Sequence, residues 1–396
     1  MLGIAELLIA GLLVAYLFRR LRLPGLLGML LVGLVVSPHA LGWVSPAFLD
    51  SSDAFRVLAL VVILLRAGLQ IRRSALKQVG KSAILLAFVP GLCEAFAITF
   101  LAPLWMPLTY LEAALLGFIL AAVSPAVIVP MMIDYQSRGL GMKKGIPTMV
   151  LAASAIDDAV AILIFSILLG VYLNGQDLFS GVVVGLPISL MGGVAIGVGV
   201  GYLLIQLFVN FRVRATQQML LLMALAVILI QLEHTFLHFS PFIAIVSMGF
   251  VVLEKQESMA DVLSDKLSHV WTFASVLLFV TIGAQVNVHL AWSAGWPAFV
   301  LIVCGLLVRS AVVLLTLANS VLSMRERYFV VVSFWPKATV QAAMGAVPLT
   351  MMAGLGMNTL PGEWILAVSV LSILITAPLG AIAVAFSADR CLKCYE

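Results

Sequence analysis

This sequence contains thirteen apolar stretches long enough to cross a membrane, separated by short charged or turn-rich segments. A membrane-spanning helix needs about 20 mostly apolar residues. Hydrophobic residues make up 63% of the 396 residues and charged residues only 10%, which is more apolar surface than a soluble fold of this length can bury. Soluble enzymes, nucleic-acid binders and disordered proteins are therefore excluded. The predicted spans are residues 2–18, 24–44, 54–70, 82–104, 111–133, 146–171, 180–209, 216–233, 240–254, 269–286, 295–318, 328–353 and 363–387.

The basic residues predict the orientation of these spans. Of the 22 Lys and Arg residues, 18 lie in alternate loops or in the C-terminal tail, and the loops between them hold none. The positive-inside rule places such basic loops in the cytoplasm. We therefore predict an all-α polytopic membrane protein with its N-terminus outside and its C-terminus in the cytoplasm. Because the sequence carries no recognisable targeting extension, we expect a bacterial inner membrane.

Five ionisable side chains lie away from the ends of the predicted spans, toward the middle of the membrane: Glu94, Asp157, Asp158, Arg309 and Lys337. A charge in the middle of a membrane helix costs roughly 2.5–3.5 kcal/mol on insertion scales. Some of these groups have a structural explanation, because Glu94 and Arg309 can neutralise each other. Lys337 can pair with a carboxylate or cap the carbonyls of a broken helix. Asp157 and Asp158 are neighbours at the centre of one span, and packing does not require two adjacent anions.

The count of these charges predicts an exchange mechanism. Three acids and two bases leave one uncompensated negative charge. One H⁺ or one monovalent cation bound at the aspartates restores neutrality, whereas an empty and fully ionised site is costly to carry through a low-dielectric barrier. A site that holds either H⁺ or a cation, and is never empty, is the core of an antiporter.

Two of the spans contain residues that interrupt helices. The span at 111–133 contains Pro125 and Pro130, and the span at 328–353 contains Pro336, Gly345 and Pro348. A proline inside a helix removes a backbone hydrogen bond and clashes with the preceding turn. Unpaired backbone is tolerated at membrane depth only where it lines a cavity or is packed against protein. Both spans are therefore predicted to be broken helices.

The two breaks occupy matching positions in two groups of three spans. Spans four to six and eleven to thirteen each have a charge in the first helix, Glu94 or Arg309, and a break in the second. The offset of seven spans is odd, so the two groups cross the membrane in opposite directions. This pattern predicts an inverted repeat with two crossed discontinuous helices. Free carbonyls near Val123 and Ser124 are candidate cation ligands, with Asp158 supplying the charge.

The motifs at these breaks resemble a known family. They are Val-Ser-Pro-Ala-Val-Ile-Val-Pro at 123–130, Gly-Ile-Pro-Thr-Met at 145–149, Asp157-Asp158, and Pro-Lys-Ala-Thr-Val-Gln-Ala at 336–342. They are similar to the monovalent cation/proton antiporter superfamily, and most closely to its NHA branch of sodium/proton antiporters. The resemblance covers essentially the whole chain and implies a homodimer in the lipid bilayer, with a six-helix core that moves as an elevator. The implied domains are 1–81 (dimerisation helices), 82–171 (first half of the core), 172–215 (linker helix), 216–286 (further dimerisation helices) and 287–396 (second half of the core).

The resemblance also implies roles for individual residues. Asp158 would bind the cation or the proton, and Asp157 beside it would complete the Na⁺ site. Val123 (through its carbonyl), Ser124 and Ser154 are implied as further ligands. The implied charge-compensating residues are Lys337, Arg309 and Glu94. The transported ions would be Na⁺ or Li⁺ and H⁺, with no organic cofactor and no nucleic-acid partner.

Arg309 departs from the pattern of the electrogenic relatives that have paired aspartates, because those relatives carry a lysine in this span. Arginine effectively never deprotonates in proteins. We therefore expect exchange to approach one H⁺ per Na⁺, unless Asp157 or Lys337 supplies a second proton.

Other functions are weighed against this one. A K⁺/H⁺ antiporter of the same superfamily would differ only in the size of its cation. A sodium-coupled symporter for an organic anion uses similar crossed helices, but it needs polar side chains for a second substrate, and the predicted core has few. An intramembrane aspartyl protease needs two aspartates facing each other from separate helices, whereas neighbours on one helix point about 100° apart. A channel would need a ring of carbonyl-lining segments, which the sequence lacks.

Overall fold

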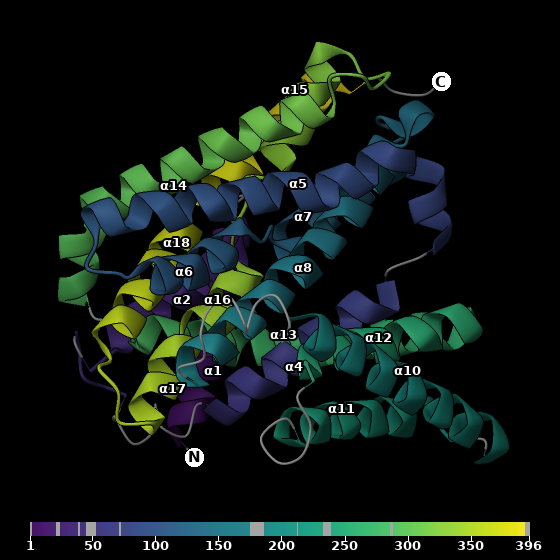
Figure 1. Cartoon of the computed structure of the whole chain (residues 1–396), viewed down its shortest axis with the longest axis horizontal. Helices are drawn as coiled ribbons and strands as arrows, with labels where there is room; N and C mark the ends of the chain where they lie inside the picture. Colours follow the sequence, from purple (N-terminus) through teal and green to yellow (C-terminus); the bar gives the residue numbers. More distant parts are fainter. Residues whose placement is uncertain are drawn as a thin grey trace. The chain divides into compact units, whose positions relative to one another are not determined.

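The computed structural model describes residues 2–20, 24–38, 40–44, 53–70, 73–174, 186–211, 213–232, 239–285 and 288–392. Within those ranges the secondary-structure elements are all helices (Figure 1). They are α1 (Leu2–Arg20), α2 (Gly25–Val36), α4 (Asp53–Gln70), α5 (Arg73–Trp105), α6 (Tyr110–Ala121), α7 (Pro125–Ser137), the 3-10 helix η1 (Met142–Lys144), α8 (Ile146–Asn174), α10 (Leu186–Phe211), α11 (Ala215–Leu232), α12 (Pro241–Lys255), α13 (Glu257–Gln285), α14 (Val288–Thr316), α15 (Met324–Ser333), α16 (Thr339–Gly345), α17 (Val347–Gly354) and α18 (Leu360–Cys391).

Every predicted span overlaps a helix or a pair of helix fragments. By length and composition, seven of the described helices are able to cross a membrane: α5, α8, α10, α11, α13, α14 and α18. The number of thirteen crossings stays a prediction. Some helices extend beyond the predicted spans. The apolar span of α5 begins at Ile84, close to the predicted 82, although the helix itself begins at Arg73, and the span in α13 begins at Glu257 rather than 269. A helix satisfies its own backbone hydrogen bonds in water as well as in lipid, so it does not have to begin where the apolar residues begin.

The chain forms two compact units. Unit 1 comprises residues 1–52, 75–161 and 276–396, and unit 2 comprises residues 53–74 and 162–275. In unit 2, α12 packs against α4, α10 and α11. A Cβ on Gly68 would lie 2.3 Å from the Val246 carbonyl oxygen, so α4 and α12 cross at a distance that only glycine permits. The assignment of dimerisation and core domains is not tested by this division and stays a prediction.

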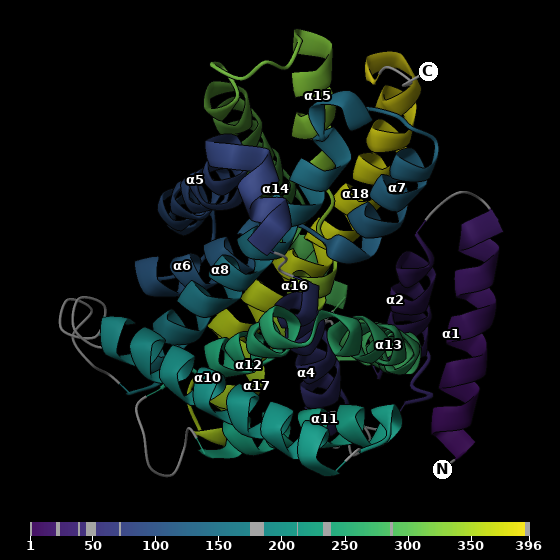
Figure 2. The ribbon, with the colours of Figure 1, turned by 90° about the vertical axis from the view of Figure 1, so that its right-hand side faces the viewer.

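In unit 1, α18 packs against α14, α15, α16 and α17, and also against α6 and α7. The neighbouring helices α1 and α2 lie side by side in the same unit (Figure 2). A buried apolar cluster joins α7, α15 and α18 through residues such as Met132, Phe329 and Val384. Between membrane helices such a cluster is stabilised by van der Waals packing, because lipid is as apolar as these side chains. This cluster packs the broken helices firmly against α18.

Two helices of unit 1 are interrupted, as the sequence predicts. The first interruption separates α6 from α7 at residues 122–124, and Pro125 is the first residue of α7. Proline suits this position because the first residues of a helix have no intrahelical acceptor for their N–H groups. The second interruption separates α15 from α16 at residues 334–338 and contains Pro336. These are the two discontinuous helices of the predicted inverted repeat.

Three residues predicted as helix breakers behave differently. Pro130 lies inside α7, so its assignment to the break was wrong. A proline here removes one hydrogen bond, and the rest of the short helix continues around it. Gly345 is the last residue of α16, and Pro348 is the second residue of α17. Only Ala346 separates these two short helices, so this second interruption is minor.

Both broken helices begin in the same way. Thr109 and Glu112 form a capping box at the start of α6, and Ser323 and Glu326 form one at the start of α15. In each box the glutamate accepts a hydrogen bond from the backbone N–H of the capping residue, at 2.7 and 2.6 Å. Such boxes satisfy N–H groups that a helix leaves unpaired. The two broken helices therefore have the same kind of N-terminal cap, as expected if they are equivalent members of an inverted repeat.

Glu326 also forms an ion pair with Lys144 of η1, at 2.7 Å from Nζ to Oε2. Partial burial by itself would raise the pKa of the Glu326 carboxyl, but the hydrogen bonds from Lys144 and Ser323 outweigh it and lower that pKa. A carboxyl with a lowered pKa stabilises the fold above its unfolded pKa of about 4.3, and this contribution is lost as the pH falls through the folded pKa.

We predict that Lys144→Met lowers the free energy of unfolding at pH 7 by about 1 kcal/mol, because it removes this ion pair and leaves the capping box intact. The difference from the wild type should shrink as the pH falls below the ordinary range for glutamate. Thermal unfolding of the detergent-solubilised protein between pH 7 and pH 4 measures it, with Lys143→Met at the neighbouring exposed lysine as the control. A difference that does not depend on pH would contradict the prediction.

Candidate functional site

The two interruptions meet directly. The backbone N–H of Ser124 donates to the carbonyl of Pro336 at 2.8 Å. The side-chain amide of Gln341, on α16, donates to the carbonyls of Ile119 and Ala122 at 2.8 and 2.9 Å. These carbonyls belong to the end of α6, where helices leave acceptors unpaired. The second broken helix therefore satisfies the exposed backbone of the first.

A cluster of four charges lies beside this crossing: Glu94, Asp157, Arg309 and Lys337. Each of these side chains is no more than 3% exposed. Arg309 donates to Glu94 Oε2 at 2.6 Å and to Asp157 Oδ2 at 2.8 Å. Lys337 Nζ donates to the same Glu94 oxygen at 2.8 Å. The four formal charges thus sum to zero and each group forms an ion pair, although Arg309 Nε has no hydrogen-bond partner among the described residues.

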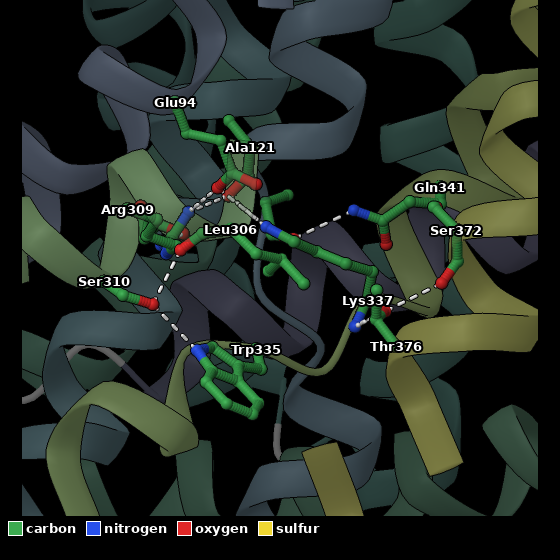
Figure 3. Close-up of polar contacts among 12 residues, drawn as sticks. Glu94, Ala121, Leu306, Arg309, Ser310, Trp335, Lys337, Gln341, Ser372 and Thr376 are labelled. Atoms are coloured by element: carbon green, nitrogen blue, oxygen red, sulfur yellow. Dashed lines mark hydrogen bonds and ion pairs between the residues drawn. The ribbon is translucent and has the colours of Figure 1, made fainter. Parts of the chain in front are cut away.

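The two bases of this cluster also bind the end of α6. Both Arg309 and Lys337 donate to the carbonyl of Ala121, and Figure 3 shows the two side chains reaching it from different elements. Cations stabilise the carboxyl end of a helix, where the peptide dipoles leave partial negative charge. The ring of Phe334 lies 5.2 Å from the Arg309 guanidinium. Trp335 donates to Ser310 at 3.0 Å, which ties the second interruption to α14 (Figure 3).

Close packing of α5 brings the cluster together. In Figure 1, α5 and α14 lie side by side. Glu94 of α5 forms an ion pair with Arg309 of α14. A Cβ on Gly91 would lie 2.4 Å from Asp157 Oδ1. The missing side chain at this position therefore lets α5 approach the middle of α8, where Asp157 lies.

Asp158 differs from the other four ionisable groups. It is 3% exposed, and neither of its carboxylate oxygens has a hydrogen-bond partner among the described residues. The backbone amide of Val123 lies nearby without completing a hydrogen bond of ordinary geometry. A buried carboxylate with two open oxygens is costly, so it calls for a proton or a cation.

The other open oxygens belong to the two broken helices. In the part of the chain that the structure describes, every buried side-chain oxygen without a partner belongs to Ser124, Asp158, Thr339 or Gln341. Ser154 lies one turn before Asp158 on α8, and its hydroxyl donates to the Leu151 carbonyl at 3.1 Å. That hydroxyl oxygen keeps lone pairs able to accept or ligate. Hydroxyl, carboxylate and carbonyl oxygens are the ligands that hard cations prefer.

The predicted site residues therefore lie in two sets. Val123, Ser124 and Asp158 lie at the crossing, where the Ser124 hydroxyl and the Asp158 carboxylate have no hydrogen-bond partner among the described residues. The charged groups of the second set are ion-paired with one another: Glu94, Asp157, Arg309 and Lys337. No group of three or more His, Cys, Asp or Glu side chains among the described residues is arranged to hold a resident metal ion. The contact of Asp157 with Arg309 and the role of Gln341 were not foreseen. A lone glutamine in an apolar helix was the available signal for the second.

Comparisons with known proteins agree with this geometry. A family model described as "Sodium/hydrogen exchanger, transmembrane" matches residues 7–388. Sodium/hydrogen exchanger 9B2 of Xenopus tropicalis is 30% identical, over 99% of this chain and 75% of that protein. Sodium/hydrogen exchanger 9B1 of Macaca fascicularis is 30% identical, over 94% of this chain and 73% of that protein. The human 9B2 exchanger is 31% identical, over 94% and 71%.

The fold is also similar to a solved structure. The sodium proton antiporter MjNhaP1 from Methanocaldococcus jannaschii, at pH 8, matches with a TM-score of 0.82 and 21% identity. The match covers 98% of this chain and 97% of that one. The predicted superfamily and the predicted antiporter fold are thus both confirmed. The 9B1 and 9B2 exchangers named above are from animals, so they give no support to the expectation of a bacterial inner membrane.

We predict that Arg309→Leu lowers the free energy of unfolding by about 3–5 kcal/mol, because it leaves Asp157 as an unpaired buried charge. Equilibrium unfolding in detergent micelles measures the loss. The exposed Arg325→Leu is the matched control, with an expected change within about 0.5 kcal/mol. Adding Asp157→Leu to Arg309→Leu should recover part of the loss, since the pair is then removed together. Equal losses for Arg309→Leu and Arg325→Leu would contradict the prediction.

Proposed function

The chain belongs to the transmembrane sodium/hydrogen exchanger family, and we propose that it exchanges Na⁺ or Li⁺ for H⁺ at Asp158. The observation that carries this proposal is the buried Asp158 carboxylate, whose two oxygens have no partner among the described residues. The neutral four-charge cluster beside it leaves no cation free to compensate it.

The charge balance explains why the two ions compete. Glu94 and Asp157 are matched by Arg309 and Lys337, so Asp158 carries the remaining charge of the group. A proton or a monovalent cation cancels that charge, and both at once leave an excess positive charge in a low-dielectric region. Occupancy by one ion therefore displaces the other. The state with Asp158 ionised and no ion bound has the highest free energy. The change between outward-facing and inward-facing conformations is therefore unfavourable unless a proton or a cation is bound.

The neighbouring oxygens are the proposed ligands of the cation. The Val123 carbonyl and the Ser124 hydroxyl come from the first interruption, and Ser154 lies on the same face of α8 as Asp158. Asp157 is adjacent, but one of its oxygens is bound by Arg309. We therefore assign Asp158 the exchange and Asp157 a supporting place in the Na⁺ site. Lys337, Arg309 and Glu94 compensate charge without binding the transported ion.

The wider transport cycle rests on the family resemblance. We propose an elevator-type movement of a core domain within a homodimer, with the C-terminus in the cytoplasm. We also propose that the protein resides in a bacterial inner membrane. K⁺/H⁺ exchange is the alternative that the same residues permit, because K⁺ and Na⁺ differ in size and share oxygen ligands. A sodium-coupled organic-anion symporter would also need a site for the anion.

We predict that Asp158→Asn abolishes exchange, because a neutral amide neither binds a cation by charge nor releases a proton at working pH. The measurement is cation-induced pH dequenching in proteoliposomes, with Na⁺, Li⁺ and K⁺ offered separately. Asp134→Asn, at an exposed aspartate of α7 paired with Arg138, is the control and should keep exchange. Full activity of Asp158→Asn would refute the site, and activity with K⁺ alone would favour the alternative.

We also predict a stoichiometry near one H⁺ per Na⁺. Arg309 cannot release a proton, and both Asp157 and Lys337 are held in ion pairs. Reversal potentials measured in proteoliposomes at several ion gradients test this, because electroneutral exchange reverses where the Na⁺ and H⁺ gradients are equal, whatever the membrane potential. A clear ratio of two H⁺ per Na⁺ would show that a second group releases a proton.

A further inference from the structure

Gln341 is the one uncharged polar side chain that joins the second broken helix to the carboxyl end of the first by two hydrogen bonds in the described structure. It is fully buried, on the first turns of α16. Figure 3 shows its side chain directed toward the end of α6, next to Lys337. It binds the carbonyls of Ile119 and Ala122. In the sequence these two residues flank Ala121, whose carbonyl accepts hydrogen bonds from Arg309 and Lys337.

The hydrogen-bond partners of the Gln341 side-chain amide determine which side its NH₂ group and its oxygen face. Both partners of the Gln341 amide are carbonyl oxygens, and only the NH₂ group donates to a carbonyl. The orientation is therefore determined by chemistry, and the amide oxygen is the atom without a partner. Glutamine thus gives two donors to the end of α6 and leaves an oxygen among the open oxygens of the crossing.

The residue after Ala122 is the one whose carbonyl faces the ion site in the proposed function. Among the described residues, none donates a hydrogen bond to the Val123 carbonyl. Its direction depends on the peptide before it, and Gln341 holds the Ala122 carbonyl of that peptide at 2.9 Å. Ser124, whose hydroxyl is open, is held at the other side by its bond to Pro336.

We propose that Gln341 is a positioning residue that determines ion specificity. By holding the Ile119 and Ala122 carbonyls, it sets where the Val123 carbonyl and the Ser124 hydroxyl stand relative to Asp158. These positions set the size of the oxygen cage, and so the preference among Li⁺, Na⁺ and K⁺. This inference rests on the proposed exchange at Asp158, and it assigns a function to a residue on the opposite half of the inverted repeat.

The test uses Gln341→Met, which keeps the length of the side chain and removes both donors. In proteoliposomes we expect the KM for Na⁺ to rise about tenfold, with a smaller effect on the maximal rate, because a misplaced carbonyl weakens cation binding. We also expect a changed order of preference among Li⁺, Na⁺ and K⁺. Gln341→Asn retains the amide but is too short for both carbonyls, so it should give the same shift while keeping the site polar.

The matched control is Gln218→Met. Gln218 is also a buried glutamine that donates to a backbone carbonyl, that of Val213 at 2.9 Å, but it lies on α11 in unit 2. Its replacement should lower stability without changing the KM or the ion preference. Gln341→Asn serves as the test variant if Gln341→Met does not fold.

The outcomes are separable. If both Gln341 variants fold and show an unchanged KM and unchanged ion preference, then Gln341 is only structural and the inference is wrong. If the wild type does not exchange ions, or Asp158→Asn exchanges fully, then the proposed function itself has failed. A raised KM with altered preference, absent from Gln218→Met, supports the inference.

Discussion

The guanidinium of Arg309 joins Glu94 on α5 to Asp157 on α8, and the arrangement at the crossing depends on this neutralisation. Without it, Asp157 would lie unpaired in a region that excludes water, at a cost of several kcal/mol, and Glu94 would keep Lys337 alone as its partner. With it, the adjacent aspartates become chemically distinct. Asp157 is held by Arg309, and Asp158 keeps two open oxygens. One pairing thus converts two similar side chains into a structural group and a candidate exchange group.

The same region resolves a backbone problem. A helix that ends in the middle of a membrane leaves carbonyls without partners, and lipid offers no donors. Here the acceptors at the end of α6 are bound by Arg309, Lys337 and Gln341. In the second interruption, the Lys337 N–H donates to the Thr376 hydroxyl of α18 at 3.0 Å. Arg309 and Lys337 therefore have two roles: they neutralise the buried carboxylates, and they satisfy the backbone acceptors that the break in the first helix leaves unpaired.

Much of this fold follows from local rules that act along the chain. The paired breaks at Pro125 and Pro336 follow from the missing N–H of proline, and the membrane spans follow from hydropathy. Pro130 was misjudged, because the loss of one hydrogen bond does not end a helix that neighbouring turns support. The pairing of Arg309 with Glu94 was expected from their charges and matching positions in the repeat. Its contact with Asp157, 152 residues away, was not predicted, because no spacing rule along the chain gives such a contact. Gln341 was overlooked for the same reason, since its acceptors come from the other half of the repeat.

The hydrogen bond from the Ser124 N–H to the Pro336 carbonyl joins the two broken helices at their interruptions, where the backbone is not helical. A relative displacement of the two midpoints would strip the Pro336 carbonyl and the Ser124 amide of their partners at once. This hydrogen bond therefore favours a joint displacement of the two interruptions over an independent one.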